Sequence, residues 1–207
     1  SELNNLKSIS IVDVFSVGKA LVIRLNNGYS IISHNQLYGK WTFNRPKTVI
    51  NSRRQLRIEF TTNSKVVRLW SATNIQLFLT KDEYQHPYLK KIGPDVLNDS
   101  TSIDIIIQIL KGKKVINRSL SSVLLDQSVI SGLGNYLRSE ILFFASLSYT
   151  QRVSELTQGQ LYILAKSIKD VSLRAYMQKG KTVDLNYLEK EFGNKENFKK
   201  LKHMVFS

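Results

Sequence analysis

The sequence predicts an α+β protein in which an N-terminal β-sandwich precedes an α-helical domain. Two observations support this division. Short β-branched segments separated by turn residues fill the first half of the chain. Apolar residues at helical spacing, together with helix-capping pairs, characterise the second half. The two patterns meet near residue 98, so we expect a β domain over residues 1–98 and a helical domain over residues 99–207.

The composition is that of a soluble and strongly basic globular protein. The 207 residues include 30 Lys and Arg against 16 Asp and Glu, which gives a formal net charge of +14 and a pI of about 9.9. A hydrophobic fraction of 42% excludes a disordered chain, and the absence of cysteine excludes a disulfide scaffold. No segment has the length of a membrane span or the form of a secretion signal. The charge favours a polyanionic partner, with nucleic acid first and an anionic membrane surface second.

Five strands are expected in the first half of the chain. The first is rich in isoleucine and valine, and Asn27-Gly28 supplies a hairpin turn between the second and the third. The fourth alternates strictly, with Leu56, Ile58 and Phe60 on one face, and a polar turn leads into the fifth. Short strands at this spacing are typical of a β-sandwich. The expected strands are residues 9–15, 20–25, 29–34, 55–60 and 66–70.

A connection over residues 86–94 is expected to separate the strands from the helices. After it, Thr101 and Asp104 have the spacing of a capping box that opens a helix over residues 105–110. The β-branched residues in that segment leave a strand as the alternative.

Three further helices are expected. The first of them ends at residues 131–132, and the next begins near Asn135. The last starts at a capping box formed by Thr157 and Gln160, and Gly180 is a suitable stop for it.

Gly132 and Gly134 lie at the break before the helix that begins near Asn135. A glycine pair bends the backbone sharply, and the amides that open the next helix form an anion site. Dinucleotide-binding folds use a similar pair, but after a strand and with a third glycine where this chain has Leu137. A helix–turn–helix unit that grips a phosphate therefore fits better than a dinucleotide-binding fold, but the spacing alone favours a plain interhelical turn.

Five segments carry a resemblance to a known family: residues 17–21, 33–39, 92–97, 124–127 and 132–142. The last two resemble the helix–two-turn–helix signature of the formamidopyrimidine-DNA glycosylase and endonuclease VIII family. Residues 33–39 and 92–97 resemble the endonuclease VIII branch in particular, and residues 17–21 lie where the family has its Arg-Gly-Lys hairpin. The segments follow the family's order and spacing, and together they cover nearly the whole chain.

The resemblance implies a DNA-repair enzyme of bacterial type, a bifunctional DNA glycosylase and AP lyase. Members of this branch excise oxidised pyrimidines from a flipped nucleotide and then cut the strand through a Schiff base. The implied partner is double-stranded DNA that carries oxidised bases or abasic sites, held in a basic cleft between the domains. We expect a monomer in the bacterial cytoplasm, associated with the nucleoid and not with a membrane.

The resemblance also implies roles for individual residues. Lys19 matches the hairpin lysine that assists proton transfer at the sugar. Gln36, Leu37 and Tyr38 match the segment that fills the gap left by the flipped base. Residues matched to DNA contacts in the second half are Lys91, Gly132, Gly134 and Asn135. Lys91 replaces an arginine of the branch, which keeps the charge but loses the bidentate fork.

Each of these residues also has an ordinary interpretation. Without the family, Lys19 is a solvated strand lysine. Leu37 and Tyr38 would be strand or turn apolar residues, and Asn135 would be a helix N-cap, a role that is compatible with phosphate binding.

Two features depart from the family pattern. Members begin with Pro-Glu-Gly-Pro on a helix that enters the active site, whereas this chain begins with Ser1-Glu2. Members normally close with a four-cysteine zinc finger, whereas residues 203–207 resemble the strand that precedes it. Without cysteine, and with three scattered histidines, we expect no zinc or other metal cofactor. We therefore expect these residues to bind DNA with weak or no glycosylase activity.

Two other classes of function stay open at this point. One is a non-catalytic DNA-binding or lesion-sensing homologue that kept the scaffold without the chemistry. The other is an RNA- or ribosome-associated helix–two-turn–helix protein, which would show no preference for a damaged base and would give residues 36–38 no role.

Overall fold

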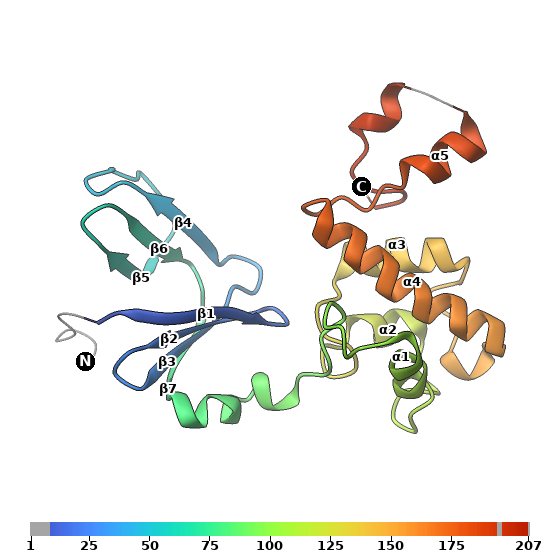
Figure 1. Ribbon diagram of the computed structural model, residues 1–207, viewed down its shortest axis with the longest axis horizontal. Coiled ribbons are helices and arrows are strands. Elements are labelled where there is room, and N and C mark those ends of the chain that lie inside the picture. Colours follow the sequence, from blue (N-terminus) through green and yellow to red (C-terminus); the bar gives the residue numbers. More distant parts are fainter. Residues whose placement is uncertain (1–8, 194–195, 207) are drawn as a thin grey trace. The chain divides into compact units, whose positions relative to one another are not determined.

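The computed structural model describes residues 9–193 and 196–206. The chain forms two compact units, of which unit 1 ends at Lys90 and unit 2 begins at Lys91 (Figure 1). Among the described residues, no helix is long and apolar enough to cross a membrane.

This division lies before residue 98, where the sequence patterns change. The segment between the two positions is bonded to unit 2. The amide of Gly93 donates to the carbonyl of Gln127 at 2.8 Å, and the amide of Val96 donates to the carbonyl of Ser131 at 3.2 Å. Main-chain hydrogen bonds of this kind cannot be recognised from composition, so the boundary between the units lies earlier in the chain than the change of sequence pattern.

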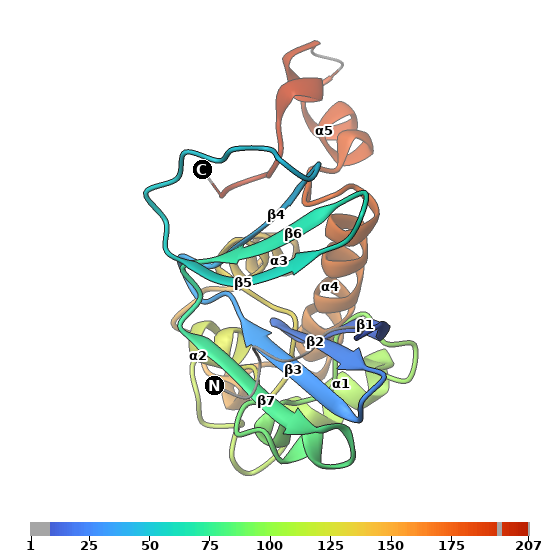
Figure 2. The same ribbon diagram turned by 90° about the vertical axis from the view of Figure 1, so that its left-hand side faces the viewer.

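Unit 1 contains two antiparallel sheets, which Figure 2 shows one above the other. The order is β1-β2-β3-β7 in the four-stranded sheet and β4-β6-β5 in the three-stranded sheet. The strands are β1 (Ile11–Val17), β2 (Ala20–Leu25), β3 (Tyr29–His34), β4 (Lys40–Asn44), β5 (Leu56–Thr61), β6 (Val66–Trp70) and β7 (Asn74–Leu79).

The two faces of the four-stranded sheet carry different cores because side chains alternate along each strand. Ile23 and Ile31 point to the face that packs with Trp41 and Phe60 of the second sheet. Val22 and Ile32 lie in a separate cluster on the other face, with the following apolar residues around them: Phe15, Val17, Ala20, Phe78, Tyr88 and Leu89. The sandwich is thus confirmed, and one face of its larger sheet is covered by the segment that follows β7.

An ion pair with a buried carboxylate fixes that segment to the sheet. Glu83 lies in the 3-10 helix η2 (Thr80–Gln85) and is only 1% exposed. Arg24 on β2 hydrogen-bonds both of its carboxylate oxygens, and the Ser30 hydroxyl donates to it at 2.7 Å. The hydrogen bond from Arg24 lowers the pKa of Glu83, so this carboxylate stays charged at neutral pH.

The five predicted strands are all present, but β4 and β7 were not predicted. Both are edge strands of their sheets. An edge strand is buried on less of its surface and can carry polar residues and exposed apolar ones, such as Phe43 at 72% exposure. The edge strands β1 and β5 were nevertheless predicted, because β1 is rich in β-branched residues and β5 alternates apolar and polar residues over its whole length.

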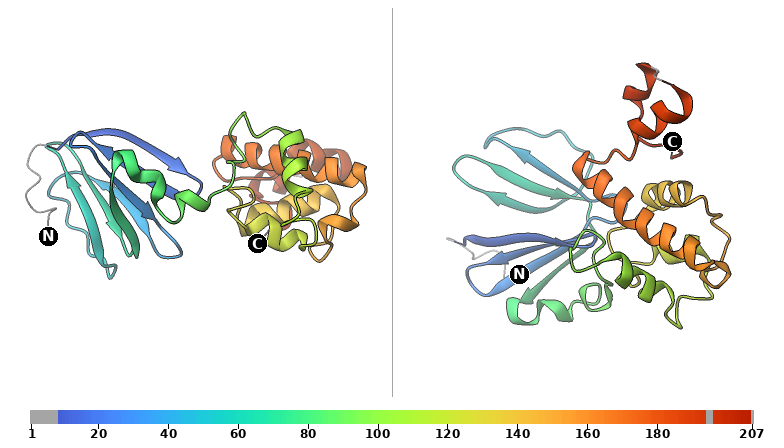
Figure 3. Two further views of the ribbon diagram at one scale, coloured as in Figure 1. Left: turned by 90° about the horizontal axis from the view of Figure 1, so that it is seen from below. Right: turned by 45° about the vertical axis from the view of Figure 1, so that its right-hand side comes forward.

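Unit 2 is helical, and its long helix α4 runs beside α3 and α1 (Figure 3). The cluster of apolar residues between the helices includes Ile106, Leu124, Ile141 and Ile168, all at most 1% exposed. The α-helices are α1 (Ile103–Leu110), α2 (Leu120–Leu125), α3 (Asn135–Ala145), α4 (Gln158–Met177) and α5 (Leu185–Phe192), and the 3-10 helices are η3 (Leu89–Lys91), which crosses the boundary between the units, η4 (Val153–Glu155) and η5 (Glu196–Lys200). Together with the sandwich, this confirms the α+β class.

Two predictions about the first helices are corrected by the structure. The segment after residue 102 is the predicted helix and not the alternative strand, but its N-cap is Ser102, whose hydroxyl accepts from the Ile105 amide, and not Thr101, which is buried. The second helix ends at Leu125 and not at residues 131–132. The reason is the Asp126 carboxylate, which accepts from the Ser128 amide at 2.9 Å and turns the chain out of the helix.

The capping box of Thr157 and Gln160 is confirmed at the start of α4. The helix ends at Met177, close before Gly180, which has a φ of +93° and donates its amide to the Ala175 carbonyl at 2.7 Å. This left-handed position favours glycine, and the bond satisfies a carbonyl at the end of the helix.

The expected strand over residues 203–207 is absent over residues 203–206, and Ser207 lies outside the described residues. A buried carboxylate on α3 holds this segment instead. Glu140 is fully buried and accepts hydrogen bonds of 2.8–3.0 Å from the amides of Met204, Val205 and Phe206 and from the Thr182 hydroxyl. Amides that bond a carboxylate are not available to a strand partner, which explains the irregular backbone.

Candidate nucleic-acid interface

Lys19 lies in the tight turn between β1 and β2. Gly18, with a φ of +56°, forms this turn, and the Lys19 amide donates to the hydroxyl of Tyr88 at 3.0 Å. Although Lys19 is exposed as a residue, partial burial of its ammonium lowers its pKa below the ordinary lysine value. A larger share of this amine is therefore neutral near pH 8 than in a fully solvated lysine.

His34 is a titratable neighbour of Lys19 that sequence reasoning did not select. It ends β3, pairs with Ala20 across the sheet, and packs its ring against that of Tyr88 with 5.0 Å between the centroids. Burial first, and the charge of Lys19 second, lower the pKa of His34, so its imidazole is neutral at neutral pH. Its position within the motif of residues 33–39 was the signal that could have identified it.

The three residues after Asn35 form an exposed turn, which we call the 36–38 loop (Gln36, Leu37 and Tyr38). Gln36 has a φ of +50°, and its amide donates to His34 Nδ1 at 3.0 Å. Its side-chain oxygen accepts a hydrogen bond from the Thr73 hydroxyl. Leu37 and Tyr38 are 87% and 68% exposed, so two apolar side chains project into solvent from a fixed backbone.

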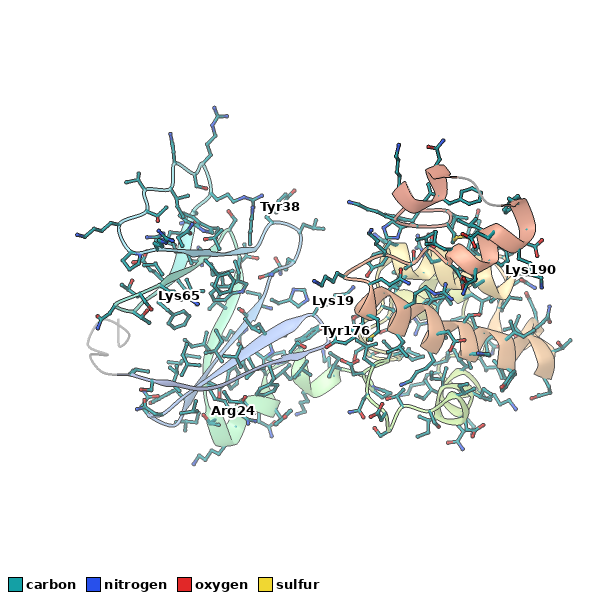
Figure 4. All side chains as sticks on the ribbon, turned by 45° about the horizontal axis from the view of Figure 1, so that its top comes forward. Lys19, Arg24, Tyr38, Lys65, Tyr176 and Lys190 are labelled. Atoms are coloured by element: carbon teal, nitrogen blue, oxygen red, sulfur yellow. The ribbon has the colours of Figure 1, made fainter. Side chains whose placement is uncertain are left out.

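The structure brings Lys19 and the 36–38 loop together at one end of unit 1. Figure 4 labels Lys19 and Tyr38, which lie at the same end of the sandwich. The link between them is short, because His34 pairs beside Lys19 in the sheet and also bonds the first residue of the loop. A basic amine and an exposed apolar loop thus share one surface.

In unit 2, the glycine pair forms the turn before α3. Gly132 has a φ of +96°, and its amide donates to the side-chain oxygen of Gln127 at 3.2 Å. The amide group of Gln127 donates in turn to the carbonyl of Leu133 at 2.8 Å. The Gln127 side chain therefore bridges two backbone groups of the turn, an interaction that a plain interhelical turn does not require.

The start of α3 has the geometry of an anion site. Gly134 is the N-cap, and no side chain caps the helix. The first amides of an α-helix have no intrahelical acceptor, so they face outward with a partial positive charge. Asn135 is the first helical residue and is exposed; the interpretation as an N-cap is therefore wrong, and its side chain is open to solvent beside these amides.

Aromatic rings from the C-terminal segment pack beside this helix start. The Tyr136 ring lies 5.2 Å from that of His203 and 6.3 Å from that of Phe206, measured between centroids. These ring contacts, together with the hydrogen bonds to the Glu140 carboxylate one helical turn further on, attach the C-terminal segment to the first turns of α3. The cluster was not predicted, because it joins residues more than sixty positions apart in the chain.

Lys91 is exposed at the end of η3 and belongs to unit 2, as do Gly132, Gly134 and Asn135. The sequence-predicted residues therefore form two groups, with Lys19 and the 36–38 loop in unit 1 and the other four in unit 2. The chain has no cysteine, and no group of three or more metal-ligating side chains occurs in the described part of the chain.

Two kinds of sequence comparison, with a family model and with curated proteins, find similarity to the same family. The family model described as the formamidopyrimidine-DNA glycosylase H2TH domain matches residues 92–186. "Endonuclease 8" from Klebsiella pneumoniae is 38% identical over 163 residues, which cover 79% of this chain and 62% of that protein. "Endonuclease 8" from an Escherichia coli strain is 36% identical over 173 residues, which cover 82% of this chain and 64% of that protein. The chain thus spans less than two thirds of the length of these curated relatives.

Solved structures agree on the fold. The Lactococcus lactis formamidopyrimidine-DNA glycosylase, bound non-covalently to DNA that contains an AP site, aligns with a TM-score of 0.73 at 20% identity over 85% of this chain and 67% of that one. The same enzyme in complex with DNA that contains an oxidised pyrimidine aligns with a TM-score of 0.73 at 19% identity over 88% of this chain and 70% of that one. At this identity the likeness establishes a shared fold.

Proposed function

We propose that this chain belongs to the formamidopyrimidine-DNA glycosylase and endonuclease VIII family, that it binds damaged double-stranded DNA, and that it carries the scaffold of a bifunctional glycosylase and AP lyase for oxidised pyrimidines. The observation that carries the proposal is the arrangement at the end of unit 1. There, a lysine with a lowered pKa shares one surface with an exposed apolar loop.

Each half of that arrangement has a task in base excision. An enzyme that acts on a base within a duplex extrudes the nucleotide and fills the gap that it leaves, and Leu37 and Tyr38 are suited to enter the base stack. Extrusion exposes the sugar to protein side chains. Lys19 exchanges a proton near neutral pH more readily than a solvated lysine, so we assign it proton transfer at that sugar.

We propose that unit 2 supplies backbone contacts. The free amides at the start of α3 and the exposed amide of Asn135 would bind one phosphate, with Gly132 and Gly134 allowing its close approach. Lys91 would neutralise another as a point charge. Such contacts fix the position of the duplex and carry no sequence information.

We further propose that the chain acts as a monomer and is associated with the bacterial nucleoid. One copy carries both groups of predicted DNA-contacting residues, so no second copy is needed to complete the set. Sedimentation of the chain with a short duplex should then give one protein per duplex.

Borohydride trapping tests the chemistry directly. The 207-residue chain is mixed with duplexes that contain an abasic site or an oxidised pyrimidine, and the yield of covalent adduct measures the chemistry, because borohydride reduces a Schiff base between a protein amine and the sugar to a stable amine. Lys19→Gln should lower adduct formation by roughly 10²-fold, the typical contribution of a general acid or base, while duplex binding changes little.

Two results would contradict parts of this proposal. Preferential binding of the damaged duplex without any adduct would identify a non-catalytic lesion-binding homologue. Equal competition by structured RNA and by damaged DNA would favour the RNA-associated alternative, because that class has no use for a flipped base.

A further inference from the structure

The segment between Asp13 and Glu59 is unusual in its charge. It contains no Asp or Glu and eight Lys or Arg. Arg24, one of the eight, is engaged by Asp13 and Glu83. The acidic residue that ends the segment is also engaged, because the Glu59 carboxylate pairs with Arg68 at 2.6 Å. The other basic residues of this segment are therefore not neutralised by the carboxylates at its two ends.

Three of these residues line one cavity in unit 1, which we call the arginine pocket. Its volume is about 440 Å³, and Arg53, Arg54 and Arg57 line it together with Tyr38 and Thr73. All three arginines are exposed. Within the described ranges, none of them forms an ion pair, whereas each of Arg24, Arg68, Arg118 and Arg174 does.

The arginine pocket shares its wall with the 36–38 loop. Arg54 donates a hydrogen bond from its guanidinium to the carbonyl of Tyr38. Thr73, which also lines the pocket, donates a hydrogen bond to the side chain of Gln36. Arg54 is thus engaged in holding the loop, whereas Arg53 and Arg57 line the pocket without an ion pair among the described residues, and Arg57 makes one long contact of 3.3 Å to Gln55.

We propose that the arginine pocket binds a backbone phosphate of the duplex next to the point where the 36–38 loop enters it. This inference rests on the proposed function and adds a DNA contact to the Lys19 end of the site. A guanidinium presents a planar pair of donors that matches the oxygens of a phosphate, and two such groups around a concave site bind it better than a single point charge. The contact would fix the register of the loop on the strand before the base is displaced.

A pair of double variants tests the role of the pocket. Arg53→Gln with Arg57→Gln removes two charges from the pocket, and Arg45→Gln with Lys47→Gln removes two charges from the same segment outside it. Binding to an abasic-site duplex is measured by fluorescence anisotropy over a range of salt concentrations. We expect the pocket pair to weaken binding on the order of tenfold and to reduce the salt slope by about 0.9 for each phosphate that the protein no longer neutralises. The control pair should show a smaller effect on both.

A second measurement locates the phosphate. Single methylphosphonate substitutions make one phosphate at a time neutral on either strand around the abasic site. For the unmodified protein, at least one position within a few nucleotides of the site should weaken binding. For the Arg53→Gln and Arg57→Gln variant, the same position should have no further effect, because the guanidinium groups that would bind this phosphate are already absent.

The outcomes separate the pocket from the proposed function. If the pocket pair and the control pair lose affinity and salt slope equally, the segment acts only through its total charge and the pocket assignment is overturned. The same holds if no methylphosphonate position loses its effect in the pocket variant. If the unmodified chain shows no salt-dependent binding to any duplex, the proposed function itself fails. Thermal unfolding of each variant confirms that it folds.

Discussion

The chemistry of Lys19 depends on the residues around its ammonium group. A lysine in a β-turn is ordinarily solvated. Here the turn lies against the segment that follows β7, and the Tyr88 hydroxyl accepts a hydrogen bond of 3.0 Å from the Lys19 amide. This contact spans 69 positions of the chain, so local sequence patterns could not reveal it.

We expect Lys19 to titrate below the ordinary lysine pKa of about 10.4, because burial disfavours its charged form. Between its own pKa and that value, the amine is neutral while solvated lysines are still protonated. Reductive methylation with ¹³C-formaldehyde followed by NMR titration measures the midpoint, and Lys19→Arg assigns the signal by removing it. A midpoint at or above that of a lysine peptide would contradict the expectation.

Leu37→Ala should reduce binding to damaged DNA more than binding to an intact duplex. Leu37 is 87% exposed, so its truncation changes folding stability by less than about 0.5 kcal/mol, and an effect on lesion capture reports its contact with the base stack. Anisotropy with an abasic-site duplex and its undamaged counterpart measures both affinities.

Val49→Ala is the matched control for Leu37, since Val49 is an aliphatic residue at 92% exposure in the loop between β4 and β5. Equal losses of affinity on the two duplexes for Leu37→Ala would argue against entry of the loop into the base stack.

At the scale of elements, the sequence was most informative where a signal is local. Asn27-Gly28, the box at Thr157, and the glycine pair before Asn135 each act within a few residues, and the strand, helix and turn that they predict are confirmed. The early end of α2 was missed because it depends on how one carboxylate, that of Asp126, competes with the helix backbone.

The start of α3 leads to a prediction about phosphate binding. Asn135→Ala should weaken binding to damaged and undamaged duplexes by the same factor, on the order of tenfold, because a contact to phosphate does not distinguish bases. Asn186→Ala removes an exposed asparagine from α5 and serves as the control in the same anisotropy assay. A loss restricted to the damaged duplex would contradict a role in phosphate binding.

Glu140 should be the most costly single carboxylate to remove from unit 2. It is fully buried and accepts bonds from three amides and one hydroxyl. Glu140→Ala leaves the three amides without this acceptor and should lower the free energy of unfolding by about 3 kcal/mol. Urea denaturation measures the change, with Glu189→Ala on the exposed side of α5 as the control. A change below about 0.5 kcal/mol, the range of a neutral surface substitution, would contradict the anchoring role.

At the scale of the whole molecule, composition indicated the class of partner but not the location of contact. The net charge of +14 is spread over both units, and only the folded chain distinguishes arginines that pair with carboxylates from those that do not. The α+β class followed from the change of pattern along the chain. The order of strands did not, because β7 returns beside β3 after a separate sheet has formed.

The central claim is that this chain recognises damage in duplex DNA, and its relative affinity for two duplexes tests this most directly. The 207-residue chain is titrated into a duplex with one tetrahydrofuran abasic analogue and into the intact duplex of the same sequence, at physiological salt. We expect a preference for the analogue on the order of tenfold or more, because a missing base removes the cost of unstacking before the 36–38 loop enters. Equal affinities for the two duplexes would contradict the claim.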